Sequence, residues 1–136
     1  MQKIIEPELI FYQKLGELFY AIAAVDKVVR EQEYERLCEL VISNWRKPEN
    51  SKDEFGTNAA YQIEIVFEWF DHEQADAKEC YESFKDYFEK HPKLFTKERK
   101  QLILKTANAI ANEFAGKNKA ELMILAKLKL LFEGNQ

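Results

Sequence analysis

Two carboxylates flank the first predicted turn of the chain, and their side chains are suited to binding a hard cation. Asp26 follows an apolar helical stretch, and Glu33 lies near the start of the next one. Ca²⁺ and Mg²⁺ take several oxygen ligands, which carboxylates on facing turns can supply. The alternative is structural, with Asp26 capping the turn and Glu33 stabilised at the positive N-terminus of a helix. The structural interpretation is the simpler one, because glutamates are common in the first turn of helices.

A second set of polar side chains recurs every four residues, at Glu68, His72 and Asp76. An unbroken helix would place these three on one face, where they could act as metal ligands. A helix break near Asp71 would separate them instead. Because charged side chains are rarely buried, we expect a solvated acidic edge here rather than a metal site.

The sequence offers little for catalysis. It contains only two histidines, and His91 precedes a proline in a predicted turn. No Ser–His–Asp pattern and no glycine-rich phosphate loop is present. The two cysteines, Cys38 and Cys80, lack the second cysteine and paired histidines of a zinc site, which predicts small buried residues rather than a disulfide. We therefore predict no catalytic and no cofactor-binding residue, and expect that the protein is not an enzyme.

Composition and charge exclude several classes of protein. The net charge of −4 leaves no concentrated basic surface for nucleic acid. Hydrophobic residues make up 46% and charged residues 32%, which is the balance of a soluble globular chain. No window approaches the roughly 20 apolar residues of a membrane span, and Glu6, Pro7 and Glu8 interrupt any apolar signal-peptide region. We expect a cytoplasmic protein without direct membrane insertion.

The hydrophobic periodicity predicts an all-α fold. With 4 glycines and 3 prolines in 136 residues, the chain has few breaks between helices. We predict one domain over 1–136, a compact bundle of about six helices. The predicted helices span about 7–25, 31–45, 57–70, 77–90, 96–115 and 118–132, with a loop over 47–56. We expect Thr96 to cap the helix over 96–115, and Leu122, Leu125 and Leu128 to form the buried seam of the helix over 118–132.

Two of these helices carry informative apolar patterns. Residues 11, 15, 18, 22 and 25 form a single stripe along the first helix, which predicts one buried face. The helix over 57–70 is apolar on two sides, with Tyr61, Ile65 and Trp69 on one side and Ile63 and Phe67 on another. Either it is the central helix of the bundle, which we favour, or one side is an exposed patch for a partner.

The chain also contains an internal repeat. The tripeptide Ala-Ile-Ala at 21–23 recurs at 109–111, and the same offset places Leu15 opposite Ile103 and Ile22 opposite Ile110. Each copy is a pair of helices that cannot bury its apolar face alone. We therefore expect two helix hairpins that pack against each other, with these four residues buried.

The stretch over 18–41, LFYAIAAVDKVVREQEYERLCELV, resembles the TerB-like family of bacterial tellurite-resistance proteins. In that family a helix ends in small residues and is followed by an Asp and then by a Glu that opens the next helix. The matching residues here are Ala23, Ala24, Asp26 and Glu33, whereas the glycine that usually follows the Asp is Lys27. The resemblance implies an all-helical fold with a repeated helix pair, in agreement with the repeat above.

The resemblance also implies a function. In TerB-like proteins acidic residues of the two copies gather on one face, where divalent cation binding has been proposed. Asp26, Glu33 and Glu121 would be the metal ligands here, for Ca²⁺ or Mg²⁺, although Phe114 stands opposite Asp26 in the second copy. The leading expectation is a non-catalytic cytoplasmic module of tellurite or stress response that binds a protein partner, a homodimer being one form of such binding. The alternative is a divalent cation-binding protein.

Overall fold

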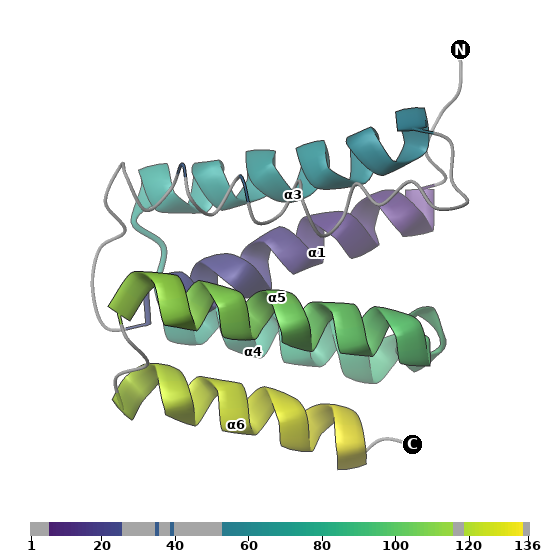
Figure 1. Ribbon diagram of the computed structural model, residues 1–136. Coiled ribbons are helices and arrows are strands. Elements are labelled where there is room, and N and C mark those ends of the chain that lie inside the picture. Colours follow the sequence, from purple (N-terminus) through teal and green to yellow (C-terminus); the bar gives the residue numbers. More distant parts are fainter. Residues whose placement is uncertain (1–5, 26–34, 36–38, 40–52, 116–118, 135–136) are drawn as a thin grey trace.

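The computed structural model describes residues 6–25, 35, 39, 53–115 and 119–134 of the protein. In these ranges all regular structure is helical, as predicted. The predicted helix over 31–45 lies outside the described residues, except that Glu35 and Glu39 are helical. The described helices, drawn in Figure 1, are α1 (Glu6–Ala23), α3 (Asp53–Glu73), α4 (Ala77–Lys90), the 3-10 helix η1 (Pro92–Leu94), α5 (Lys97–Ala115) and α6 (Lys119–Gly134).

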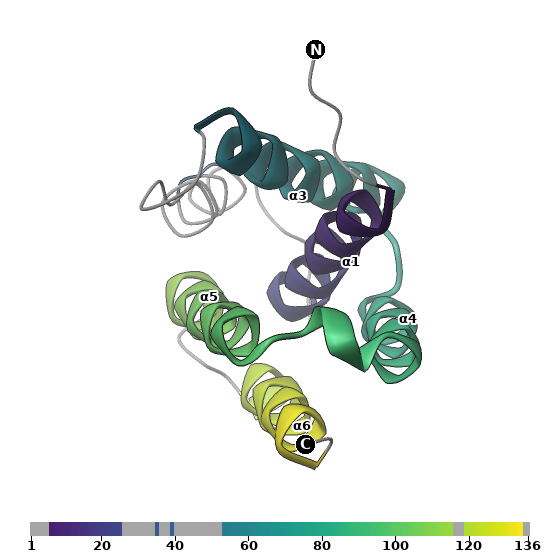
Figure 2. The ribbon, with the colours of Figure 1, turned by 90° about the vertical axis from the view of Figure 1, so that its right-hand side faces the viewer.

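The helix at the centre of the described bundle is α1. It packs against α3, α4, α5 and α6, whereas α3 and α6 lie at opposite ends of the stack in both Figure 1 and Figure 2. The prediction that the helix after residue 57 is central is therefore wrong. The physical reason is that the C-terminal part of α1 is apolar around its whole circumference, since its residues 18–23 are all buried. Within the described residues, no helix combines the length and apolarity needed to cross a bilayer.

Local signals in the sequence account for three helix ends. Asp76 caps α4 by accepting a hydrogen bond from the backbone N–H of Glu79 (2.9 Å), and α4 ends at Lys90, before the predicted His91–Pro92 break. Thr96 caps α5 as predicted, because its hydroxyl accepts from the N–H of Arg99 (3.2 Å).

The start of α3 differs from the prediction. The helix begins at Asp53 and includes Gly56, so the predicted loop over 47–56 is too long at its C-terminal end. A glycine near a helix end does not by itself terminate the helix.

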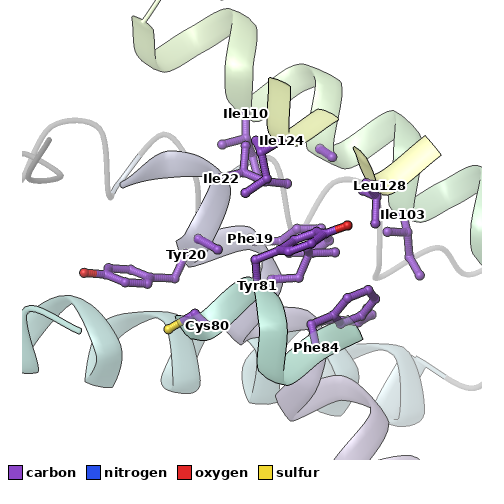
Figure 3. Packing of buried hydrophobic residues seen from close by; sticks show 14 of the residues in the cluster. Phe19, Tyr20, Ile22, Cys80, Tyr81, Phe84, Ile103, Ile110, Ile124 and Leu128 are labelled. Atoms are coloured by element: carbon purple, nitrogen blue, oxygen red, sulfur yellow. The ribbon is translucent and has the colours of Figure 1, made fainter. Parts of the chain in front are cut away.

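The core residues predicted from the repeat are all buried. Leu15, Ile22, Ile103 and Ile110 have no exposed surface. Figure 3 shows Ile22, Ile110 and Ile124 directed toward one another from α1, α5 and α6. The pairing of the repeats as two hairpins stays a prediction, because most of the 31–45 segment lies outside the described residues.

The buried side of α6 differs from the prediction at one residue. Leu125 and Leu128 are buried as predicted, but Leu122, which the sequence also placed on the buried seam, is exposed. The seam instead continues through Ile124 and Phe132. Because α6 is apolar on two sides, hydrophobic periodicity alone does not identify which side faces the core.

A glycine sets the close approach of α1 and α3. A Cβ atom added to Gly16 would lie 2.6 Å from the carbonyl oxygen of Ile63 and 2.9 Å from Cβ of Val66. Both distances are shorter than atomic contact allows, so any side chain at this position must push the two helices apart.

The Gly16→Ala variant is therefore expected to lower the free energy of unfolding by about 1–3 kcal/mol, the usual cost of overpacking a core. This loss should appear although alanine is the better helix former by about 1 kcal/mol. Urea denaturation followed by circular dichroism measures it. Gly134→Ala is the control, because a Cβ atom there meets nothing within 4 Å. Equal stability of the two variants would contradict the close helix contact.

Candidate functional site

The predicted metal ligands are only partly within the described structure. Asp26, Glu33 and the side chain of Glu121 lie outside the described residues, so this ligand set stays a prediction. Among the residues that the structure does describe, no group of three or more His, Cys, Asp or Glu side chains is placed to hold a metal ion.

The second candidate set, Glu68, His72 and Asp76, is separated by a helix end. Glu68 and His72 share a face of α3, but α3 ends at Glu73 and Asp76 caps the next helix. All three side chains are exposed. The interpretation of this region as a solvated acidic edge is therefore correct.

A row of large apolar side chains lies in solvent along α3. Tyr61, Ile65 and Trp69 are 57%, 42% and 57% exposed, and their spacing of four residues places them on one side of the helix. We call these three residues the α3 strip. The buried side of α3 carries Ile63 and Phe67 instead. An exposed apolar row of this kind is unusual for a surface that only contacts water.

The α3 strip borders a groove between α1 and α3. The groove has a volume of about 400 Å³. Another exposed apolar side chain, Ile10 of α1, lies on its far wall. Its lining residues are Ile10, Gln13, Lys14 and Glu17 from α1 and Ile65, Val66, Trp69 and Phe70 from α3. The strip and the groove together form one mainly apolar surface.

On the polar wall of this groove, Lys14 and Glu17 of α1 form hydrogen bonds with Ser83 of α4, and we call these three residues the α1–α4 link. Lys14 Nζ lies 3.1 Å from Glu17 Oε1 and donates to Ser83 Oγ at 2.7 Å. Ser83 Oγ in turn donates to Glu17 Oε1 at 3.1 Å. Glu17 is nearly buried, so these partners compensate the cost of removing its charge from water. The charge of Lys14 is thus already paired within the chain.

This link has the residue types of a serine nucleophile, but its arrangement is structural. A lysine activates a serine only when its amine is neutral and can accept the hydroxyl proton. Here Lys14 Nζ forms an ion pair with Glu17 and donates to Ser83 Oγ, so the hydrogen bond runs in the direction opposite to the one a general base needs. The three side chains therefore hold α1 against α4.

Acidic side chains line the other edge of the α3 strip. Glu64 and Glu68 precede Ile65 and Trp69 by one residue each, which places them on the side of α3 that faces away from the groove. Burial, and next the negative charge of Glu68, raises the pKa of the Asp71 carboxyl above its usual value. This edge of the strip is therefore a region of negative potential.

The buried thiol of Cys80 is not suited to catalysis. Burial, and next the charge of Glu17, raises its pKa to about 12. The thiol therefore stays protonated at neutral pH, and the protonated form is a poor nucleophile.

A larger hollow, of about 620 Å³, lies where α1 ends and α4 and α6 begin. Tyr20 and Tyr81 line it, and the Tyr20 hydroxyl donates to the carbonyl of Ala75 at 2.8 Å. Two lysines and two acidic residues also line it, Lys78, Lys127, Asp76 and Glu82. These charges balance, so the hollow favours no class of charged ligand.

Comparison with known proteins identifies no relative of this chain. No family model matches the chain, and neither the curated proteins nor the solved structures give a match. The α3 strip matches the less favoured of the two alternatives for the helix over 57–70, an exposed patch for a partner. The exposure of Ile10 was not predicted, because its only signal in the sequence is its position beside the buried stripe of α1.

Proposed function

We propose that this protein is a non-catalytic helical module that binds a protein partner through the α3 strip and the adjoining groove. The observation that carries the proposal is the exposure of Tyr61, Ile65 and Trp69 along one side of α3. Exposed apolar surfaces of this kind mark interaction sites, and tyrosine and tryptophan contribute much of the binding energy at interfaces.

The shape of the surface favours a helical partner. Residues 61 and 69 are eight positions apart, which corresponds to about 12 Å along the helix axis. A row of side chains at four-residue spacing forms a ridge that packs into the grooves of another helix. The apolar groove beside Trp69 can receive the partner's own side chains.

The resemblance of 18–41 to TerB-like proteins supports a cytoplasmic role in tellurite or stress response for this module. Divalent cation binding through Asp26, Glu33 and Glu121 is a separate hypothesis drawn from the same resemblance. No observation on the described residues favours it, so the protein-binding function is the one we propose.

A site-specific crosslinking experiment tests the proposal. We expect a photoreactive phenylalanine in place of Tyr61 to form a discrete protein adduct in cells, since this position lies within the α3 strip. The same residue in place of Lys105, which is exposed on α5, is the matched control. Adding Trp69→Gln should reduce the adduct at least about tenfold, as expected for a central interface tryptophan. Equal adducts at the two positions, or an adduct insensitive to Trp69→Gln, would contradict the proposal.

A further inference from the structure

The outward side of α6 carries a second apolar row. Leu122 and Leu130 are 49% and 67% exposed, and the exposed Ala126 lies between them at the same four-residue spacing. We call these three residues the α6 strip. The core requires only the opposite side of α6, which carries the buried Leu125 and Leu128. The α6 strip is therefore not explained by the packing of the described helices.

The charges beside the two strips are mainly of opposite sign. Lys127 and Lys129 are exposed, and the helical repeat places one on each side of the α6 strip, whereas the exposed Glu133 follows Leu130 at the C-terminal end of the strip. Glu64 and Glu68 lie beside the α3 strip. A surface with apolar residues and flanking lysines is complementary to a surface with apolar residues and flanking glutamates.

The two strips also match in length and lie far apart on the molecule. Each consists of three side chains at four-residue spacing, which is the ridge used when two helices pack with both i±4 rows interdigitated. In Figures 1 and 2, α3 and α6 form opposite ends of the helix stack. One copy cannot bring its own α6 strip to its own α3 strip.

We propose that the α6 strip of one copy docks on the α3 strip and groove of a second copy. This inference rests on the proposed function and names its partner as another molecule of the same chain. The contact joins two different surfaces, so each bound pair still presents one free α3 strip and one free α6 strip. Such head-to-tail contacts produce rings or open chains rather than closed two-fold dimers.

Sedimentation velocity of the purified protein over a wide concentration range provides the test. We expect the mass of the wild-type protein to rise with concentration and to exceed that of a dimer. The Trp69→Gln and Leu130→Gln variants should each raise the Kd of self-association about thirtyfold, which corresponds to about 2 kcal/mol. Both residues are exposed, so circular dichroism should show unchanged folding. Lys105→Gln, which removes a positive charge away from both strips, should associate as the wild type does.

Mixing the two variants distinguishes this contact from a symmetric one. The Trp69→Gln protein keeps an intact α6 strip and the Leu130→Gln protein keeps an intact α3 strip. An equimolar mixture should therefore form a dimer that does not grow further. If either variant still assembles alone, or if the mixture stays monomeric, the head-to-tail contact is wrong.

The same experiments separate this inference from the proposed function. A wild-type protein that is monomeric at every concentration overturns the inference. The proposed function then stands if the photoreactive residue at position 61 captures a different protein in a Trp69-dependent manner. If position 61 captures nothing and the wild-type protein is monomeric, both proposals are wrong.

Discussion

The Phe95→Ala variant is expected to lose about 3–5 kcal/mol of unfolding free energy, as is typical when a buried phenylalanine is truncated. Phe95 follows η1 directly and lies in the connection between α4 and α5. Its ring is nearly buried and contacts aromatic rings from three helices. The ring centroids lie 5.1 Å from Phe11, 5.7 Å from Phe84, 4.9 Å from Phe88 and 6.2 Å from Phe132.

Most of these contacts have the edge-to-face geometry that adds about 0.5–1.5 kcal/mol per pair beyond the burial of area. Urea denaturation followed by circular dichroism measures the loss. The Phe95→Leu variant is the matched control, since it keeps most of the apolar volume and should lose no more than about half as much. A loss below about 1 kcal/mol for Phe95→Ala would show that the ring does not join the helices in solution.

The Ile22→Ala variant is expected to lower the free energy of unfolding by about 2–5 kcal/mol. Ile22 has no exposed surface and lies where α1 meets α5 and α6. Three helices converge there, so the surroundings cannot easily collapse into the cavity that truncation creates.

The control for this measurement is Ile65→Ala, which removes the same atoms from a half-exposed position on α3. It should change stability by no more than about 0.5 kcal/mol, because substitutions on the surface seldom cost more. Losses of similar size at the two positions would contradict the assignment of Ile22 to the core and Ile65 to the surface.

Several helix ends, and the buried residues of α1 and α5, could be predicted because each is marked by residues close together in the sequence. Thr96 marks a helix start through its side-chain hydroxyl, and the His91–Pro92 pair marks a helix end through the backbone restriction that proline imposes. The burial of Ile22 and Ile110 followed from the repeat, which is also visible in the sequence alone. These predictions needed no knowledge of how the helices pack.

The sequence could not predict which faces of α3 and α6 are buried, because this depends on contacts between helices rather than on local signals. Both helices are apolar on two sides, so the periodicity allows either side to be buried. The choice depends on which neighbours each helix meets, and α3 meets α1 through Ile63 rather than through Ile65. The contact at Gly16 had one signal in the sequence, a lone glycine inside a helical pattern, which often indicates close approach of another backbone.

The central position of α1 has a consequence for the order in which the chain can fold. Every described helix that α1 contacts follows it in the sequence, and α6 begins about a hundred residues after α1 does. During synthesis α1 therefore leaves the ribosome before the helices that cover it, and its apolar C-terminal part stays uncovered while they are made. Closing contacts over such long stretches of chain costs entropy before the packing compensates for it. A nascent chain that is interrupted before α5 and α6 would expose Phe19 and Ile22, and chaperones that bind apolar segments would recognise α1 first.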